Sequence, residues 1–384
     1  MRRPWIMILL TVLTMAALPA VAGASVWSIE PSPNVAGSSG SWLTAVSCSG
    51  ASCMAVGGYV SAIGQGDLAE SFDGTEWTIV PMPSPAKDNI LQSISCAGPN
   101  VCEAVGGTIG AGGAQRALAE GWNGETWVLQ PTPLVGGADA TVGLDGVSCT
   151  SPDSCEAVGG LTLPGVSAEE QPLVERWDGS TWTVQFVPNP KAENGSELNA
   201  VSCTAVDACT AGGTYYYADV ASSVFAMRWN GTSWRMQAQP NLQGQSVNAT
   251  DSVSCSGPAT CTSVGSWTND WQETLAENWD GVFWRIQLTP NPPTSVGSEL
   301  ISVSCVASGT CESVGNWSPS QTTGSALAEG YDGRWWTRQW TPTPSGATFS
   351  DLSGVDCLAA ESCVAVGSYS TSSSADTLVE NLSP

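Results

Sequence analysis

Short stretches in which apolar residues alternate with small or polar ones recur along this chain of 384 residues. Each has the form LxxVSC or a close variant, and alternation over a few residues predicts a half-buried β-strand. A fixed period near 50 residues is typical of a propeller or a solenoid. The stretches end at seven cysteines spaced 48 to 54 residues apart: Cys48, Cys96, Cys149, Cys203, Cys255, Cys305 and Cys357.

Each repeat contains three further segments that predict strands. A second cysteine follows the first after five or six residues, and a run rich in Ala, Val and Gly comes next, as in residues 55–58. A variable stretch leads to a segment such as LAESF, residues 68–72, and Asp-Gly or Asn-Gly then precedes a tryptophan in most repeats. These dipeptides between two apolar runs are strong signals of a β-hairpin. We therefore predict four antiparallel strands, A to D, in every repeat.

The two ends of the chain supply complementary parts of a repeat. Residues 378–384 provide a strand C without a strand D, whereas residues 26–33 resemble strand D and the proline-rich segment that follows it elsewhere. Pairing of the two ends would close a ring and remove an open sheet edge. The predicted fold is an all-β, seven-bladed β-propeller of four-stranded antiparallel blades. It spans residues 25–384, and its N-terminal strand completes the last blade.

The first 24 residues have the pattern of a secretory signal peptide. Arg2 and Arg3 precede an apolar stretch, and Ala22-Gly23-Ala24 fits the small-residue cleavage rule. An uncleaved membrane anchor is the alternative, but the apolar stretch is short for a spanning helix. We expect cleavage after Ala24 and a secreted, extracellular protein without stable membrane insertion.

Export favours disulfide bonds for the 14 cysteines. Metal clusters are the alternative, but the chain has no histidine and its cysteines occur as evenly distributed pairs. Cysteines that flank a tight hairpin can lie opposite each other within bonding distance. We predict one bond in each A–B hairpin: Cys48 with Cys53, Cys96 with Cys102, Cys149 with Cys155, Cys203 with Cys209, Cys255 with Cys261, Cys305 with Cys311, and Cys357 with Cys363.

The formal net charge of −24 limits the range of partners. A negative field of this size repels nucleic acid and anionic lipid and keeps a protein soluble. We expect no nucleic-acid partner. The expected state is a monomer, and the expected partner is an extracellular protein or glycan.

Residues 55–85 resemble a kelch repeat. The kelch pattern has a glycine doublet, then an aromatic residue, a tryptophan after the C–D turn and a proline-rich exit. These features match Gly57 and Gly58, Tyr59, Trp77 and residues 81–83. The Asp-Gly-x-x-Trp turn also resembles the Asp-box of sialidase-like propellers. Three repeats depart from the doublet at its second position, with Ser266, Asn316 and Ser368.

This resemblance implies a binding platform. Galactose oxidase, a secreted enzyme of this type, holds copper with Tyr and His, and this chain has no histidine. Sialidases use an arginine triad, but the arginines beside the predicted C–D turns do not converge on a channel mouth. We assign no catalytic residue. Those arginines are Arg176, Arg228, Arg235 and Arg285.

In the predicted topology the A–B and C–D turns share one face, and the variable B–C and D–A loops share the other. Function tends to lie in variable loops on a rigid frame. Aromatic side chains there are candidates for stacking on sugars or contacting a protein. Packing between blades is the alternative, above all for the five that repeat six residues after the second cysteine. The repeated candidates are Tyr59, Tyr215, Trp267, Trp317 and Tyr369, and the others are Tyr216, Tyr217 and Trp271.

Five carboxylates stand at the start of strand A. Because strand A is innermost, they could ring the mouth of a central channel and bind a hard cation such as Ca²⁺. Solvated carboxylates at the strand entry are the alternative, and no other cofactor is expected. The five residues are Asp145, Glu197, Asp251, Glu299 and Asp351.

A glutamate recurs in strand C of six repeats. We predict a structural role, in which its carboxylate accepts hydrogen bonds from backbone or tryptophan N–H groups. The six residues are Glu70, Glu120, Glu175, Glu277, Glu329 and Glu380.

The predicted function is that of an extracellular, non-catalytic binding scaffold with a protein or polysaccharide ligand on the B–C/D–A face. Without histidine, acid–base chemistry would depend on carboxylates, lysine or tyrosine. A carboxylate-dependent glycan-cleaving enzyme is therefore the alternative. A structural component of the cell envelope is the second alternative.

Overall fold

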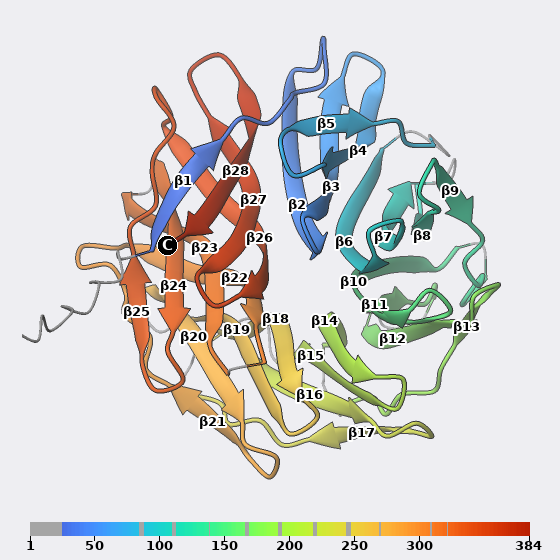
Figure 1. The fold of residues 1–384 in the computed structure, drawn as a ribbon. Coiled ribbons are helices and arrows are strands. Elements are labelled where there is room, and N and C mark those ends of the chain that lie inside the picture. The colour runs from blue at the N-terminus through green and yellow to red at the C-terminus, as the bar shows by residue number, and fades with distance from the viewer. Residues whose placement is uncertain are drawn as a thin grey trace, which may run out of the picture.

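The computed structural model describes residues 25–83, 88–109, 113–137, 139–165, 169–190, 194–217, 221–242, 247–268, 270–307, 309–320 and 322–384. The regular secondary structure of these residues consists of 28 β-strands, without a helix. The strands form antiparallel units of four, as predicted, which we call blades 1 to 7 in chain order (Figure 1). The predicted signal peptide, residues 1–24, lies outside the described residues, within which no helix is long and apolar enough to cross a membrane.

The four strands of a blade are arranged side by side, in order from the centre of the molecule to its outer edge (Figure 1). The innermost strands, A, are β2 (Gly40–Ser49), β6 (Asn89–Gly98), β10 (Thr141–Ser151), β14 (Ser196–Ala205), β18 (Val247–Gly257), β22 (Gly297–Cys305) and β26 (Phe349–Ala359). The B strands are β3 (Ser52–Ser61), β7 (Val101–Ile109), β11 (Ser154–Thr162), β15 (Ala208–Tyr216), β19 (Thr260–Thr268), β23 (Cys311–Ser320) and β27 (Ser362–Ser370).

The outer half of each blade carries the larger side chains. The C strands are β4 (Gly64–Phe72), β8 (Gln115–Trp122), β12 (Glu170–Trp177), β16 (Ser222–Trp229), β20 (Gln272–Trp279), β24 (Thr323–Tyr331) and β28 (Ala375–Ser383). The D strands, at the outer edge, are β5 (Trp77–Val80), β9 (Trp127–Gln130), β13 (Trp182–Val184), β17 (Trp234–Gln237), β21 (Trp284–Gln287), β25 (Trp336–Gln339) and β1 (Val26–Glu30).

The N-terminal strand supplies strand D of blade 7. β1 pairs antiparallel with β28, from Val26 opposite Ser383 to Glu30 opposite Val379, and the two strands lie side by side in Figure 1. This pairing agrees with the prediction. One difference concerns blades 4 to 6, which single parallel pairings join into a sheet of twelve strands: Ser222 with Val247, and Gln272 with Gly297.

All seven predicted disulfide bonds are confirmed. In every blade the two bonded cysteines are direct partners in the A–B register, as Cys149 and Cys155 are in blade 3. Each bond closes a loop of only a few residues, so the stabilisation expected from the chain-entropy model is about 2 kcal/mol per bond. No described cysteine is free.

Hydrogen bonds between side chain and backbone link the innermost strands of neighbouring blades. The serine before the first cysteine of one blade accepts the backbone N–H of the first cysteine in the next, at 2.9–3.0 Å. Between blades 7 and 1 the acceptor is Asp356 Oδ2, 2.7 Å from the backbone nitrogen of Cys48. The six serines are Ser47, Ser95, Ser148, Ser202, Ser254 and Ser304.

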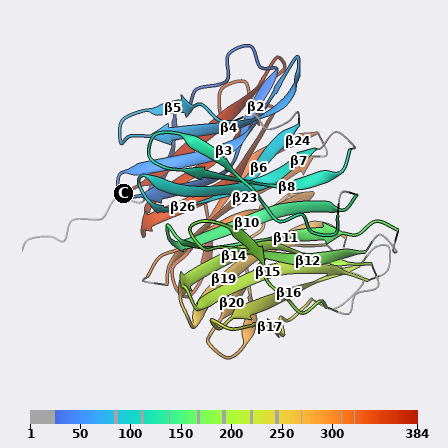
Figure 2. The same ribbon diagram turned by 90° about the vertical axis from the view of Figure 1, so that its right-hand side faces the viewer.

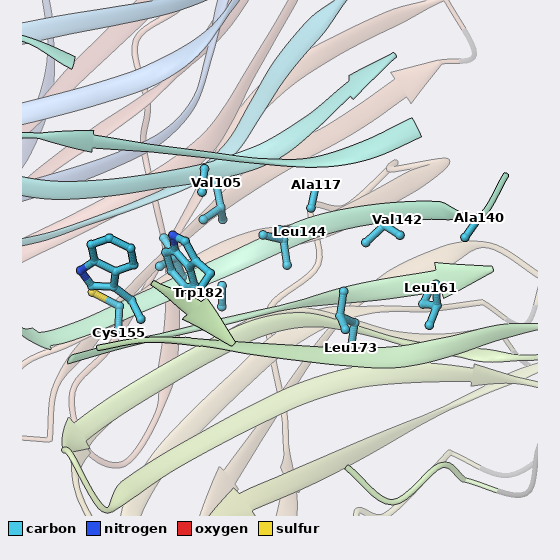
Figure 3. Close-up of a cluster of buried hydrophobic side chains, with 13 residues drawn as sticks. Val105, Ala117, Ala140, Val142, Leu144, Cys155, Leu161, Leu173 and Trp182 are labelled. Carbon is cyan, nitrogen blue, oxygen red and sulfur yellow. The ribbon is translucent and has the colours of Figure 1, made fainter. Parts of the chain in front are cut away.

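The hydrophobic core is divided into clusters that lie between neighbouring blades. Figure 3 shows one of them, in which Val105 and Ala117 of blade 2 lie near Leu144, Leu173 and Trp182 of blade 3. In the view turned by 90° the strands of successive blades lie side by side (Figure 2), so each blade presents one face to its neighbour. Each blade therefore buries its apolar side chains only against the neighbouring blade.

The first tryptophan of strand D is fixed by the preceding blade. Trp182 Nε1 donates to Gln130 Oε1 at 2.6 Å, and Trp234 Nε1 donates to Gln185 Oε1 at 2.5 Å. The same bond joins Trp284 to Gln237, Trp336 to Gln287, and Trp27 to Gln339. Two tryptophans lack a protein acceptor, Trp127 and Trp77. For Trp127 the reason is visible in the sequence, because Val80 stands where most D strands have glutamine. For Trp77 the equivalent residue is Glu30, whose carboxyl group accepts a hydrogen bond from Asn381 instead.

Val80→Gln is expected to stabilise the protein by about 1 kcal/mol, because it supplies an acceptor for the buried N–H of Trp127. Urea unfolding should show a higher midpoint with an unchanged slope. Ile79→Gln is the control, since Ile79 is the exposed neighbour in the same strand. Equal effects of the two substitutions would contradict the proposed hydrogen bond from Trp127 to the glutamine introduced at position 80.

Candidate functional site

A polar cavity of about 540 Å³ lies where the innermost strands of the seven blades meet. Its lining is polar and uneven. Thr44, Gln92 and Ser93 come from blades 1 and 2, whereas carboxylates come from blades 3, 4 and 5. The lining carboxylates are Asp145, Glu197 and Asp251.

Two further side chains extend this group at one end of the cavity. Glu197 is the second residue of β14, Glu170 begins β12 and Tyr216 ends β15. The start of strands A and C and the end of strand B all lie on the face of the B–C and D–A loops. We call Asp145, Glu170, Glu197, Asp251 and Tyr216 the acidic mouth.

Tyr216 and Glu197 are held together within the acidic mouth. Tyr216 Oη donates a hydrogen bond to Glu197 Oε1 at 2.5 Å. Burial, this hydrogen bond and the nearby carboxylates all raise the pKa of Tyr216 above its ordinary value of 10.0. Tyr216 is therefore a neutral donor at physiological pH, and it fixes the position of the carboxylate.

The other carboxyl groups of the mouth are hard to ionise. Burial raises the pKa of Asp145 to about 7, and the nearby Glu197 adds to the shift. The pKa of Asp251 is raised to about 7 by burial and by the nearby Glu299 and Glu197. Glu170 also has a pKa of about 7, because of burial and of Glu197 and Asp145. Like charges in a partly desolvated space account for all three shifts.

The side chain of Glu170 reaches the mouth over a glycine. A Cβ atom on Gly160 would lie 2.1 Å from Glu170 Oε1, so no larger residue fits there without displacing the carboxylate. Gly160 is the second glycine of the doublet in blade 3. One residue of the kelch-like pattern thus has a local steric role at the site.

Two of the five predicted cation ligands are bound by their own neighbours. Glu299 accepts hydrogen bonds from Gln272 at 2.8 Å and Asn316 at 2.7 Å. Asp351 accepts from Ser353 and Ser368, both at 2.7 Å. In the part of the chain that the structure describes, no group of three or more Asp, Glu, Cys or His side chains is arranged to hold a metal ion.

Most of the predicted aromatic candidates pack between strands. Tyr59, Tyr215, Trp317 and Tyr369 are half-buried and contact the hydrophobic clusters, which agrees with the packing alternative. Trp267 is also half-buried.

The three aromatics outside the repeat have separate environments. Tyr217 donates to or accepts from Ser223 at 2.8 Å and packs against the Tyr215 ring, while Trp271 is 57% exposed at the loop face. Tyr216 points into the acidic mouth, where it bonds to Glu197. The eight candidates therefore do not form one aromatic surface.

The predicted partners of the strand C glutamates are wrong. All six side chains are buried, but in Glu120, Glu175, Glu329 and Glu380 neither carboxyl oxygen has a protein hydrogen-bond partner. Tryptophan N–H groups bond to the glutamines of strand D instead. Burial raises the pKa of these four groups from 4.5 to about 8, so they are largely protonated at neutral pH.

Sequence reasoning identified three carboxylates of the mouth and missed Glu170. Glu170 stands at the end of a B–C loop and has no counterpart in the other blades, so the repeat gave no signal. A local signal exists, since Glu169-Glu170 is an acidic pair at the entrance of a strand.

No protein-family model matches the chain, and no curated protein matches it in sequence. Among solved structures it is similar to YCF48 bound to a D1 peptide, with a TM-score of 0.53 and 10% identity over 93% of this chain and 97% of the other. It is also similar to an ulvan lyase bound to -[GlcA(1-4)Rha3S]-, with a TM-score of 0.56 and 8% identity over 89% and 94%. The SapL1 lectin in complex with alpha methyl fucoside gives 0.50 and 12% over 80% and 98%. At these identities the similarity concerns the fold alone, which is that of the β-propeller proteins.

The buried strand C carboxyls predict that stability falls as pH rises. Their pKa is about 8 in the folded chain against 4.5 ordinarily. The folded chain therefore binds more protons than the unfolded chain between these values. Their contribution is complete below about pH 4.5 and is lost as the pH passes through about 8. The melting temperature should fall between pH 5 and pH 8.

Glu175→Gln should make this pH dependence shallower, whereas Glu76→Gln, in an exposed turn, should leave it unchanged. A melting temperature that is constant or rises over this range would contradict the assignment.

Proposed function

We propose that the chain is a secreted, closed seven-bladed propeller that acts as a binding scaffold and holds a glycan at the acidic mouth. The observation that carries this proposal is the convergence of Asp145, Glu170, Glu197, Asp251 and Tyr216 at one end of the central cavity. Within the described part of the chain, the mouth offers hydrogen-bond acceptors, one fixed phenol and no basic side chain. The predicted leader, residues 1–24, and the seven disulfide bonds support export.

The charge of the mouth selects among sugars. Acceptor groups fit the hydroxyls of a neutral sugar and attract a positively charged nitrogen, whereas they repel a uronate or a sulfate. The lectin and YCF48 structures are named with a fucoside and a peptide, which supports a binding role for this fold. The ulvan lyase is named with a glucuronate-containing ligand, and an anionic chain of this kind does not suit an acidic mouth. We therefore infer a neutral or cationic sugar as the ligand.

A second function, glycan cleavage, is favoured by one feature of the same site. Asp145 and Asp251 have a pKa of about 7 and lie close enough to Glu197 for its charge to raise those values. A carboxyl group with a raised pKa beside a second carboxyl group is the arrangement that general acid catalysis of glycoside hydrolysis uses.

Binding can be tested with oligomers of N-trimethylated glucosamine, whose charge does not change with pH. Affinity should rise between pH 6 and pH 8, because Asp145, Glu170 and Asp251, each with a pKa of about 7, ionise in this range. Glu197→Gln should weaken binding about tenfold, which corresponds to about 1.4 kcal/mol. Isothermal titration calorimetry would measure both effects.

Glu76→Gln removes the same charge on the opposite face and serves as the control. If it weakened binding as much as Glu197→Gln, long-range charge and not the mouth would be responsible. Absence of binding by both the cationic and the neutral oligomers would contradict the proposed ligand class.

Cleavage can be tested by incubating neutral oligosaccharides with the protein and separating the products by chromatography. The enzyme reading predicts a rate that falls at least a hundredfold in Asp145→Asn or Asp251→Asn, since general acid catalysis contributes about 10²–10⁴-fold. Binding without cleavage products would contradict the enzyme hypothesis and support the binding scaffold.

A further inference from the structure

The C–D turns of blades 5 and 6 break the repeat. In these turns the third and fourth residues are Val282-Phe283 and Arg334-Trp335, and Val282, Phe283 and Trp335 are 64%, 62% and 56% exposed. Blades 1 to 4 carry polar pairs at the same place: Thr75-Glu76, Glu125-Thr126, Ser180-Thr181 and Thr232-Ser233.

The turn itself does not require these apolar residues. Asp280 Oδ1 accepts the backbone N–H groups of Val282 and Phe283, and Asp332 Oδ1 accepts those of Arg334 and Trp335. The turns with polar pairs have the same bonds, as between Asp178 and Ser180-Thr181. The third and fourth side chains of the turn are therefore not needed for its backbone hydrogen bonds.

The two outer edges are in contact with each other. Gln287 at the end of β21 accepts a hydrogen bond from Trp336 Nε1 at 2.7 Å and donates to Tyr331 Oη at 3.1 Å. Exposed apolar residues also follow both D strands, Leu288 at 85% and Trp340 at 71%. Figure 1 shows β21 and β25 at the periphery of the molecule. We call the exposed apolar residues Val282, Phe283, Leu288, Trp335 and Trp340 the outer shelf.

Arginines accompany the aromatic rings of the outer shelf. Arg285 Cζ lies 5.9 Å from the centre of the Phe283 ring, and Arg334 Cζ lies 5.4 Å from that of Trp335. Arg285 Nε bonds to Asp280 at 2.9 Å, but its side chain stays 67% exposed. Arg338 is also exposed in β25. Three of the 11 basic residues of the chain thus lie on two neighbouring edges.

We propose that the outer shelf binds an anionic polysaccharide. Aromatic rings supply flat apolar faces for sugar rings, and the guanidinium fork matches a carboxylate. A protein partner would need pockets for its anchoring side chains. None of the five shelf residues lines a described cavity, although a cavity of about 250 Å³ is lined by Asp332, Thr337 and Gln339 of blade 6. The shelf residues stand at equivalent positions of two neighbouring blades, so an extended chain that crosses both edges can contact them in turn. This site goes beyond the proposed function, because it lies on the outer edge and takes a ligand of opposite charge.

The net charge of −24 does not cancel this attraction. Charges are screened over about 8 Å at physiological ionic strength, so a ligand responds mainly to the charges of the shelf itself, where Asp280 and Asp332 offset part of the charge of the arginines. Binding should consequently be weak and should weaken further as salt is added.

The test uses oligogalacturonate of about ten sugars, titrated into the whole oxidised protein. Phe283→Thr with Trp335→Ser restores residues that blades 3 and 4 carry at these positions, Thr181 and Ser233, so the turns should fold normally. This double variant should weaken binding at least tenfold. Arg285→Gln with Arg334→Gln should weaken it similarly and reduce its dependence on salt.

Leu134→Thr removes an apolar side chain that is 68% exposed near blade 2 and is the matched control. Glu197→Gln, in the acidic mouth, should also leave this binding unchanged, which separates the shelf from the proposed glycan site. The proposal is overturned if oligogalacturonate does not bind, if amylose binds equally well, or if Leu134→Thr has the same effect as the shelf variants. Tighter binding of polyglutamate than of oligogalacturonate would overturn the assignment of a polysaccharide.

Discussion

The structure depends on the hydrogen bonds that join the innermost strands of neighbouring blades. The backbone N–H of the first cysteine in every blade is bound by the side chain before the equivalent cysteine in the preceding blade. A single blade is a marginal sheet that cannot bury its own faces. These contacts set the spacing of the strands around the axis, and every core cluster and every Trp–Gln bond forms on the frame that they fix.

The contact between Asp356 and Cys48 shows how the frame joins the two ends of the chain. Blade 7 has VDC where the other blades have VSC or ISC, so a carboxylate replaces the serine at the one position that faces blade 1. Burial raises the pKa of Asp356, and the hydrogen bonds that its carboxyl group accepts from Cys48 and Ser304 partly offset this shift. Together with the pairing of β1 and β28, this bond holds segments that are more than 300 residues apart in sequence.

Buried carboxyl groups have two distinct roles in this molecule. The strand C glutamates recur in six blades and are buried; in four of them neither carboxyl oxygen has a protein partner, and burial raises the pKa of these four groups to about 8. The acids of the mouth occur in only some blades: Asp145 and Asp251 share one repeat position in blades 3 and 5, and Glu197 occupies another in blade 4. Glu197 lies close enough to raise the pKa of Asp145 and Asp251, and it accepts a hydrogen bond from Tyr216. Groups that serve the frame thus recur in nearly every blade, whereas those available to a ligand occur in a few blades. The outer shelf follows the same rule, since it lies where two blades depart from the pattern.

The sequence by itself determined the seven repeats, the four strands in each, the disulfide pairs and the strand pairing of the two ends. These follow from local periodicity and from short-range cysteine spacing, which do not require knowledge of distant contacts. It also placed Glu197 and Asp251 near the axis, because their distance from a repeated cysteine fixed their depth. Only the tertiary structure decided that Glu170 and Tyr216 join them, that four of the strand C glutamates lack protein partners, and that glutamine binds five of the D-strand tryptophans. Each of these depends on contacts between side chains of different strands or different blades. The repeat pattern of a sequence does not show which of these side chains face each other.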